Sequence, residues 1–241
     1  MKIVAKTDKG LKRENNQDSY AAGELSGGAV FAVVCDGMGG AAEGALASSV
    51  AVKVIREKIS AGYSSGMSDL SIKSLLVSAV ENANKAVYDV SLSDPEYEGM
   101  GTTVVACIAT DEFVYIVYAG DSRAYLIRNG EPVQITRDHS VIQNMIENGE
   151  ITPEEALDHP QKHVITRALG VDSKIKLDFC QEDFDDEILL LCSDGLTNFI
   201  SVSDIGEILS AGIDDDSVNK LVDKANTNGG GDNITVVAAA K

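Results

Sequence analysis

Four aspartates stand where apolar, β-branched runs of the sequence meet loops, and this placement could do chemistry. They are Asp18, Asp36, Asp194 and Asp232. The end of a strand is a rigid support, so carboxylates at several strand ends can converge on one point. Converging carboxylates repel one another and require a cation, and hard divalent ions prefer oxygen ligands. The pattern therefore predicts a site for a hard metal that is bound through oxygen atoms.

The residues around these acids favour the same interpretation. Asp36 ends an apolar run and precedes Gly37, a pair that alone would be typical of a turn before a helix. Asp194 repeats the order of apolar run, acid and glycine, whereas Asp232 follows three glycines and precedes an apolar run. No lysine or arginine stands near Asp194 or Asp232 in the sequence, so these two charges need another partner.

Size and composition restrict the class of protein and its partners. The chain has 241 residues, of which 44% are hydrophobic and 24% charged, as is typical of a soluble globular protein. No apolar run approaches the ~20 residues of a membrane span, and the first residues lack the apolar region of a signal peptide. The net charge of −18 repels nucleic acids and anionic membranes. We therefore expect one domain over residues 1–241, a cytoplasmic monomer without nucleic-acid or membrane partners.

Several other polar residues are better explained by ordinary structural roles. The cysteines are far apart and form no C-x-x-C pair, so we interpret them as small buried hydrophobic residues; they are Cys35, Cys107, Cys180 and Cys192. The histidines lack the spacing of metal ligands, and we expect structural or capping roles for them; they are His139, His159 and His163. The acidic runs 182–187 and 214–216 are interpreted as surface turns or a helix start.

The spacing of apolar residues predicts the strands and helices that could position the acids. The expected strands are 3–5, 29–35, 102–109, 113–119, 124–128, 175–179, 188–192 and 234–239. The expected helices are 41–59, 70–90, 141–148, 202–209 and 218–225. Strands joined by short turns such as Asn129-Gly130 form antiparallel pairs, and a helix with one apolar stripe packs on a sheet. We therefore predict an α+β fold, an antiparallel sandwich with helices on its outer faces.

Seven segments in one order resemble the metal-dependent type 2C Ser/Thr protein phosphatases in their compact bacterial form. They are Arg13-Glu14-Asn15-Asn16-Gln17-Asp18, Asp36-Gly37-Met38-Gly39-Gly40, Gly101-Thr102-Thr103, Ala119-Gly120-Asp121-Ser122-Arg123, Thr136-Arg137-Asp138-His139-Ser140, Ser193-Asp194-Gly195 and Gly231-Asp232-Asn233. Any one of them is weak evidence, but the ordered set extends from Lys6 to Val237. The resemblance implies a four-layer α-β-β-α sandwich with two central antiparallel sheets, and a flap-like segment around residues 140–166.

The resemblance also implies metal ligands. Asp36, Asp194 and Asp232 would form the inner shell of two divalent cations, and the carbonyl of Gly37 would add an oxygen beside Asp36. Asp18 would hold the second ion, directly or through a water molecule.

A third and weaker ion would be held by Asp121 together with Asp194. Because all these ligands are oxygen atoms, two or three ions of manganese or magnesium are expected rather than zinc.

The implied reaction is hydrolysis of phosphoserine and phosphothreonine in proteins. Two divalent ions about 3.5–4 Å apart lower the pKa of a shared water, and the resulting hydroxide attacks the phosphorus in line. Asp36 and Arg13 would be the catalytic residues, because a guanidinium group suits bidentate phosphate binding and neutralises phosphoryl oxygens. Arg13 could also be an ordinary solvated charge beside Lys9 and Lys12. The implied partners are phosphorylated proteins, including a cognate Ser/Thr kinase and its substrates.

One position departs from many eukaryotic relatives, which carry a histidine directly after the Asp-Gly pair as a candidate general acid. Met38 occupies this position and cannot transfer a proton. The leaving group must then take its proton from water, from a metal-bound water or from another residue.

Two alternatives belong to other classes of function. A pseudophosphatase that only binds a ligand or partner would usually have lost metal-binding acids, which are all present here. A nucleotide-binding oxidoreductase would explain Gly37, Gly39 and Ala42 as a G-x-G-x-x-A motif, with Glu57 twenty residues further on. Glu57 lies inside a helical pattern, however, and not at the end of a second parallel strand.

Overall fold

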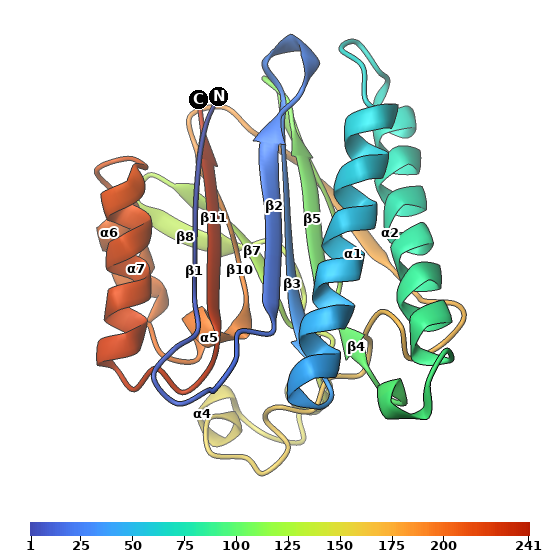
Figure 1. Ribbon diagram of the computed structural model, residues 1–241. Helices are drawn as coiled ribbons and strands as arrows, with labels where there is room; N and C mark the ends of the chain where they lie inside the picture. Colours follow the sequence, from blue (N-terminus) through green and yellow to red (C-terminus); the bar gives the residue numbers. More distant parts are fainter.

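Two antiparallel sheets form the centre of the fold, and helices cover their outer faces (Figure 1). The computed structural model describes residues 1–241, except for the side chain of Ala41. The strands are β1 (Lys2–Asp8), β2 (Asp18–Glu24), β3 (Val30–Met38), β4 (Gly101–Thr102), β5 (Val104–Ala109), β6 (Phe113–Ala119), β7 (Arg123–Arg128), β8 (Glu131–Gln134), β9 (Asp178–Asp183), β10 (Ile188–Cys192) and β11 (Ile234–Ala240). The helices are α1 (Ala41–Gly62), α2 (Asp69–Ser91), α3 (Val141–Glu147), α4 (Pro153–Ala156), α5 (Asp194–Thr197), α6 (Val202–Leu209) and α7 (Asp215–Thr227), with short 3-10 helices η1 (Ser26–Gly28) and η2 (Pro95–Tyr97).

The strand order places the ends of the chain in one sheet. The first sheet has the order β1-β11-β10-β7-β8, and the second has the order β2-β3-β5-β6-β9 with β4 paired to β3. Neighbouring strands run antiparallel, and Lys2 of β1 lies opposite Ala240 of β11. The expected hairpin turn at Asn129-Gly130 joins β7 to β8, with positive φ at both residues. Such angles are those of the turn that Asn-Gly favours between paired strands.

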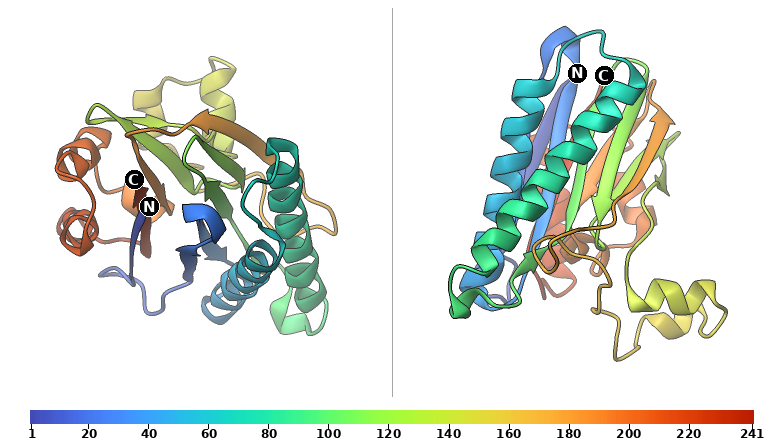
Figure 2. Two further views of the ribbon diagram at one scale, coloured as in Figure 1. Left: turned by 90° about the horizontal axis from the view of Figure 1, so that it is seen from above. Right: turned by 90° about the vertical axis from the view of Figure 1, so that its right-hand side faces the viewer.

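The alternation of side chains along the strands creates the layers. In β3, Val33 and Cys35 face the helices α1 and α2, whereas Ala32 and Val34 face the other sheet. Strands that are apolar on both faces can pack in the middle of a sandwich. Seen from above, α6 and α7 lie on one side of the sheets and α1 and α2 on the other (Figure 2). The predicted four-layer α-β-β-α architecture is confirmed.

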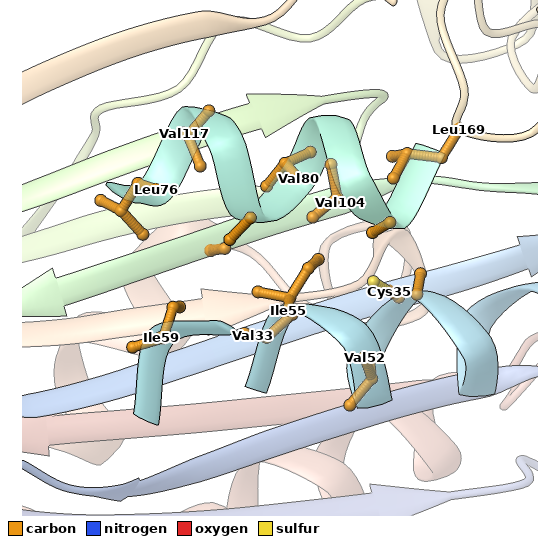
Figure 3. Packing of buried hydrophobic residues seen from close by; sticks show 14 of the residues in the cluster. Val33, Cys35, Val52, Ile55, Ile59, Leu76, Val80, Val104, Val117 and Leu169 are labelled. Atoms are coloured by element: carbon orange, nitrogen blue, oxygen red, sulfur yellow. The ribbon is translucent and has the colours of Figure 1, made fainter. Parts of the chain in front are cut away.

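The long helices are fixed by their apolar stripes and by their caps. Ile55 and Ile59 of α1 and Leu76 and Val80 of α2 are buried against the second sheet (Figure 3). Ser68 caps α2 by accepting a hydrogen bond from Ser71 N. Covering the first sheet, α7 begins with Asp214 as its cap, so the acidic run 214–216 is a helix start, as expected. Among the described residues, no helix is both long and apolar enough to cross a membrane.

Some sequence predictions were incomplete or wrong. The strand expected at 175–179 is β9 at Asp178–Asp183, because pairing with β6 begins only at Asp178. Strands β2, β4 and β8 and the short helices α4 and α5 were not predicted. The cysteines are free thiols, of which Cys180 is partly buried and the other three are buried.

Candidate active site

The predicted acids meet at one end of the sandwich. Asp18 at the start of β2 lies directly opposite Asp36 near the end of β3, since these strands are paired. Asp194 begins α5 just after β10, and Asp232 stands just before β11, the neighbour of β10. A cavity of about 420 Å³ at this end is lined by Asp36, Asp121, Asp194 and Asp232 together with Arg13. The elements that carry these acids, the end of β3 and helix α5, lie at the lower end of the sheets in Figure 1.

The end of β3 at Asp36 is held by two threonines. Asp36 N donates a hydrogen bond to Thr103 Oγ1 (2.9 Å), and the Asp36 carbonyl accepts one from Thr102 Oγ1 (2.9 Å). Gly37 is required for close packing, because a Cβ there would lie 2.0 Å from the carbonyl oxygen of Gly44 in α1. The backbone at Asp36 and Gly37 is therefore fixed between β4 and the first turn of helix α1.

Asp18 and Asp194 each have one oxygen that lacks a partner. Asp18 is 7% exposed, and its Oδ2 accepts a hydrogen bond from Ser193 Oγ (2.7 Å). Asp194 Oδ2 accepts one from Asn198 Nδ2 (2.9 Å). The Oδ1 atoms of both aspartates are buried and have no hydrogen-bond partner among the described residues. Buried polar atoms are almost always satisfied, so two orphaned carboxylate oxygens at one site indicate a missing ligand.

The electrostatics of the cluster point the same way. Burial, with smaller contributions from the charges of Asp194 and Asp232, raises the pKa of Asp18 to about 7, although the hydrogen bond from Ser193 lowers it. Burial and the charge of Asp194 raise the pKa of Asp121 to about 7. Burial, followed by the charges of Asp18 and Asp194, raises the pKa of Asp36 well above its usual range. Carboxylates so placed resist ionisation until a cation compensates their charge.

These donors fit divalent cations, because they are oxygen atoms, carry negative charge and include orphaned atoms aimed at no protein group. No three His, Cys, Asp or Glu side chains among the described residues have the spacing of a preformed metal site. The cluster therefore fits the class of ion, while the ligand role of each residue stays a prediction.

The fold places Arg13 beside Asp232. Its guanidinium donates a hydrogen bond to Asp232 Oδ2 at 2.8 Å, although 219 positions separate the two residues. This hydrogen bond raises the pKa of Arg13. Arg13 is thus a partner of Asp232 that the neighbouring sequence does not supply. The loop that carries Arg13 is fixed by Asn233, whose Nδ2 donates to the carbonyls of Lys9 (2.8 Å) and Asn15 (2.9 Å).

Asp121 lies on a turn that is held from two sides. Its neighbour Ser122 shares a hydrogen bond with Thr103 (2.7 Å), the residue that also binds Asp36 N. On the other side, Gly120 N donates to Nδ1 of the buried His139 (3.1 Å), and His139 N donates to the carbonyl of Gly120 (2.9 Å). His139 therefore has a structural role, as expected.

Several site residues were not predicted from the sequence. Thr103 and Asn233 were recognised only as parts of family-like segments, and Asn198 was not singled out at all. His163, expected to be structural, lines the active-site cavity together with Met38. The contacts of Thr103 and Asn233 join residues far apart in the chain, so no spacing in the sequence indicates them.

The fold and the site define a class of protein: an α-β-β-α sandwich that gathers carboxylates at one end of two antiparallel sheets. Residues 11–210 match the model of the family described as Protein phosphatase 2C. The chain belongs to this family, which confirms the predicted family and fold. The alternative of a dinucleotide-binding oxidoreductase is wrong, because Glu57 lies within α1 and the neighbouring strands run antiparallel.

Named relatives and solved structures agree with this placement. The chain is 37% identical over 234 residues to the serine/threonine phosphatase stp of Listeria monocytogenes serotype 4b, covering 96% of this chain and 92% of that protein. It superimposes on the serine/threonine phosphatase of S. agalactiae with a TM-score of 0.92 at 33% identity, covering 100% of this chain and 99% of the other. The catalytic domain of the phosphatase PstP in complex with 2 manganese ions gives a TM-score of 0.87 at 34% identity, with coverages of 99% and 97%.

Proposed function

We propose that this protein removes phosphate from phosphoserine and phosphothreonine side chains of proteins, and that divalent manganese or magnesium is its cofactor. The observation that carries the proposal is the cluster of carboxylates around the cavity that Arg13 also lines, with one orphaned buried oxygen on Asp194 and another on Asp18 behind the cavity. Membership of the protein phosphatase 2C family and the relatives named as serine/threonine phosphatases confirm the enzyme class.

The proposed metal ligands are the clustered acids. Asp36, Asp194 and Asp232 would hold two ions, with Asp18 behind them and the carbonyl of Gly37 beside Asp36. When bound, such ions lower the pKa of a water molecule and neutralise negative charge on a phosphoryl group.

Asp121, together with Asp194, would hold a third ion. It lines the same cavity as Asp194, and the charge of Asp194 raises its pKa.

The protein's own groups bind and orient the phosphoryl group. Arg13 is about half exposed at the mouth of the cavity, so its guanidinium can turn from Asp232 to two phosphoryl oxygens. Thr102 and Thr103 fix the backbone of Asp36, which keeps the carboxylate in place during the reaction. Met38 lines the cavity but offers no proton to the leaving serine or threonine oxygen.

The cellular setting is also proposed. The protein acts as a cytoplasmic monomer in signalling, with the whole of residues 1–241 as one phosphatase domain. It reverses the action of a cognate Ser/Thr kinase on that kinase and on its substrates. Residues 140–166 serve as a flap beside the cavity, because α3 and α4 line an adjoining groove whose lining also includes Asp121 and Asp194.

The test is phosphate release from a phosphothreonine peptide in the presence of manganese, magnesium, zinc or EDTA, with wild type and Asp36→Asn compared. We expect turnover with manganese or magnesium, its loss in EDTA, and a loss of about 10³-fold or more in the variant. Calorimetric titration with manganese should show weaker binding by Asp36→Asn. Folded wild-type protein that releases no phosphate with any metal would refute the proposal, and a binding role without catalysis would then replace it.

A further inference from the structure

A second cavity, of about 330 Å³, lies beside the active-site cavity. The two cavities share Met38 and Ile165 as lining residues. A peptide whose phosphorylated residue enters the first cavity would therefore place a neighbouring side chain near the second.

The charged residues that line the second cavity are mainly cations, and most of its other lining residues are apolar. Arg167, Lys174 and Lys176 line it, against a single acidic residue, Asp172. The protein as a whole carries 38 acidic residues against 20 lysines and arginines. Three cations at one cavity next to the site are therefore the reverse of the average surface, and they attract negative charge locally. We call residues 167–176, which carry these cations, the cationic segment.

The cationic segment is tied directly to the strand that supports Asp36. Thr102 N donates to the carbonyl of Leu169 (3.1 Å), and Leu169 N donates to the carbonyl of Thr102 (2.8 Å). The side chain of the same threonine donates to the carbonyl of Asp36. One residue thus fixes the cationic segment relative to the acid cluster.

A buried asparagine of α2 provides a second attachment. Asn84 is 2% exposed, its Oδ1 accepts a hydrogen bond from Gly170 N (2.9 Å), and its Nδ2 donates to the carbonyl of Asp172 (3.0 Å). The backbone between the attachments is therefore held in place, and the two lysines stand a few residues beyond it. Cations on an anchored segment lose less conformational entropy on binding than cations on a free loop.

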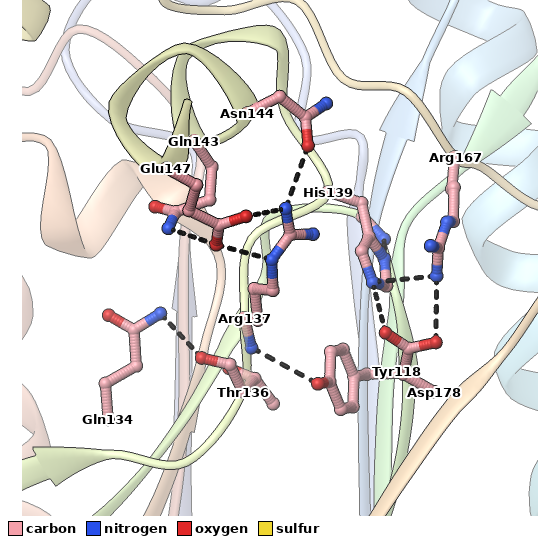
Figure 4. Close-up of polar contacts among 11 residues, drawn as sticks. Tyr118, Gln134, Thr136, Arg137, His139, Gln143, Asn144, Glu147, Arg167 and Asp178 are labelled. Atoms are coloured by element: carbon pink, nitrogen blue, oxygen red, sulfur yellow. Dashed lines mark hydrogen bonds and ion pairs between the residues drawn. The ribbon is translucent and has the colours of Figure 1, made fainter. Parts of the chain in front are cut away.

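The three cations differ in what already binds them. Arg167 donates to Asp178 Oδ1 (3.0 Å) beside the ring of His139 (Figure 4). Lys174 and Lys176 form no ion pair with any residue that the structure describes. The guanidinium of Arg167 would suit a second phosphoryl group, but it is already hydrogen-bonded to Asp178. The ammonium groups of Lys174 and Lys176 are point charges and suit single carboxylates.

We propose that this cavity binds an aspartate or glutamate side chain that flanks the phosphorylated residue of the substrate. The inference rests on the proposed phosphatase function and names its preferred substrates, which are acidic phosphopeptides. Lys174 and Lys176 supply the attraction, and the attachments through Thr102 and Asn84 place them beside Met38.

The experiment compares three phosphothreonine peptides that differ only in their flanking residues, which are alanine, glutamate or a second phosphothreonine. The measured quantity is the ratio of kcat/KM for the glutamate peptide to kcat/KM for the alanine peptide, in which any difference in active enzyme cancels. We expect wild type to prefer the glutamate peptide, and the double variant Lys174→Gln/Lys176→Gln to lower the ratio by about three- to ten-fold, mainly through KM. Added salt should lower the wild-type ratio in the same direction.

The control variant is Lys2→Gln/Lys58→Gln, which removes two exposed lysines, one at the start of β1 and one near the end of α1. These ends of β1 and α1 lie at the top of Figure 1, away from the end of the sheets that carries the acids. The control variant should leave the ratio unchanged. An unchanged ratio in Lys174→Gln/Lys176→Gln would overturn the inference, and so would an equal fall in the control variant. A preference of wild type for the doubly phosphorylated peptide alone would overturn it as well. A wild type that hydrolyses none of the peptides would instead refute the proposed phosphatase function, which is a different and separately visible result.

Discussion

The cationic segment and the flap segment border the same acid cluster, but they are held in different ways. The cationic segment is attached by buried groups of the body, namely Asn84 of α2 and the backbone of Thr102. The flap segment, residues 140–166, is organised mainly by its own helix caps, and it stands out from the sandwich in the right-hand view of Figure 2. It is attached to the body at its base, where Thr166 N donates to the carbonyl of His139, and at α3, where the partly exposed Arg137 guanidinium donates to Asn144 and Glu147 (Figure 4).

The difference separates two tasks. Groups that must keep their place relative to Asp36 are attached to strands and helices, where displacement would leave buried hydrogen bonds unmade. The flap buries few apolar side chains, Ile142 and Ala156 among them, and leaves Leu157 and Val164 exposed. A segment with so little buried surface opens at low free-energy cost. We therefore expect the flap to open at a lower free-energy cost than the segments that carry the acids and the cations.

Replacement of His139 should have the largest effect on stability, because this residue lies at the base of the flap and also holds the turn that carries Asp121. Its buried ring accepts a hydrogen bond from Gly120 N and stacks on Tyr118, with ring centroids 5.3 Å apart. We expect His139→Gln to lower the free energy of unfolding by about 2–3 kcal/mol, since buried partners lose their hydrogen bonds. Urea unfolding at pH 7.5 measures it. A loss below about 0.5 kcal/mol would show that the turn is held without this ring.

The same residue predicts a pH dependence. Burial lowers the pKa of His139, and Arg167 adds to this, while Asp178 opposes it; Nδ1 must stay unprotonated to accept from Gly120 N. The unfolded chain, with an ordinary pKa of about 6.5, binds more protons below that pH than the folded protein does. The free energy of unfolding of wild type, relative to that of His139→Gln, should therefore fall between pH 7.5 and 5.5. The comparison cancels the opposite contribution of the acid cluster, whose raised pKa values favour the folded protein as the pH falls. Equal slopes in the two proteins would contradict the neutral, structural histidine.

Asn84 tests the attachment of the cationic segment, with a smaller expected effect. Asn84→Ala leaves Gly170 N and the carbonyl of Asp172 without their partner, so we expect a loss of about 2 kcal/mol. Asn82→Ala, on the exposed side of the same helix, is the matched control and should change stability by less than about 0.5 kcal/mol. Chemical denaturation of the two variants gives both values. Similar losses in both would mean that helix α2, rather than the attachment, is being perturbed.

The elements that were predicted from the sequence are those whose own residues determine them. Strands β3, β10 and β11 are apolar on both faces, so the sequence marks their ends and hence the acids that follow or precede them. Strand β2 was missed because it contains few large apolar residues and is held by pairing with β3. In the expected strand 175–179, Ile175 and Leu177 do pack on the core, but they do so from a loop.

The acids of the site were predictable for the same reason, and their partners were not. Asp36, Asp194 and Asp232 stand next to strands that the sequence predicts, whereas Asp18 begins the unpredicted β2 and was identified through the family resemblance. Thr103 and Asn233 contact the acid-bearing segments through hydrogen bonds that only the fold creates. The pairing of Arg13 with Asp232 depends on β1 lying beside β11, which only the folded chain provides. Local pattern thus identifies the chemical groups, and tertiary structure decides which of them are brought together.

Leu157→Ala has the smallest expected effect on stability and tests how firmly the flap packs on the body. It belongs to the flap, is 70% exposed and lines the groove between the flap and Asp194. Because its side chain buries little surface in the folded protein, Leu157→Ala should change the free energy of unfolding by less than about 0.5 kcal/mol. Thermal unfolding would then shift by at most about 2 °C, since 1 kcal/mol corresponds to roughly 2–4 °C in a chain of this size. A fall in Tm of 5 °C or more would show that the flap is packed into the body as firmly as the cationic segment, and the separation of tasks would fail. An unchanged Tm would leave the flap free to rearrange around a bound phosphopeptide without cost to the fold that holds the acids.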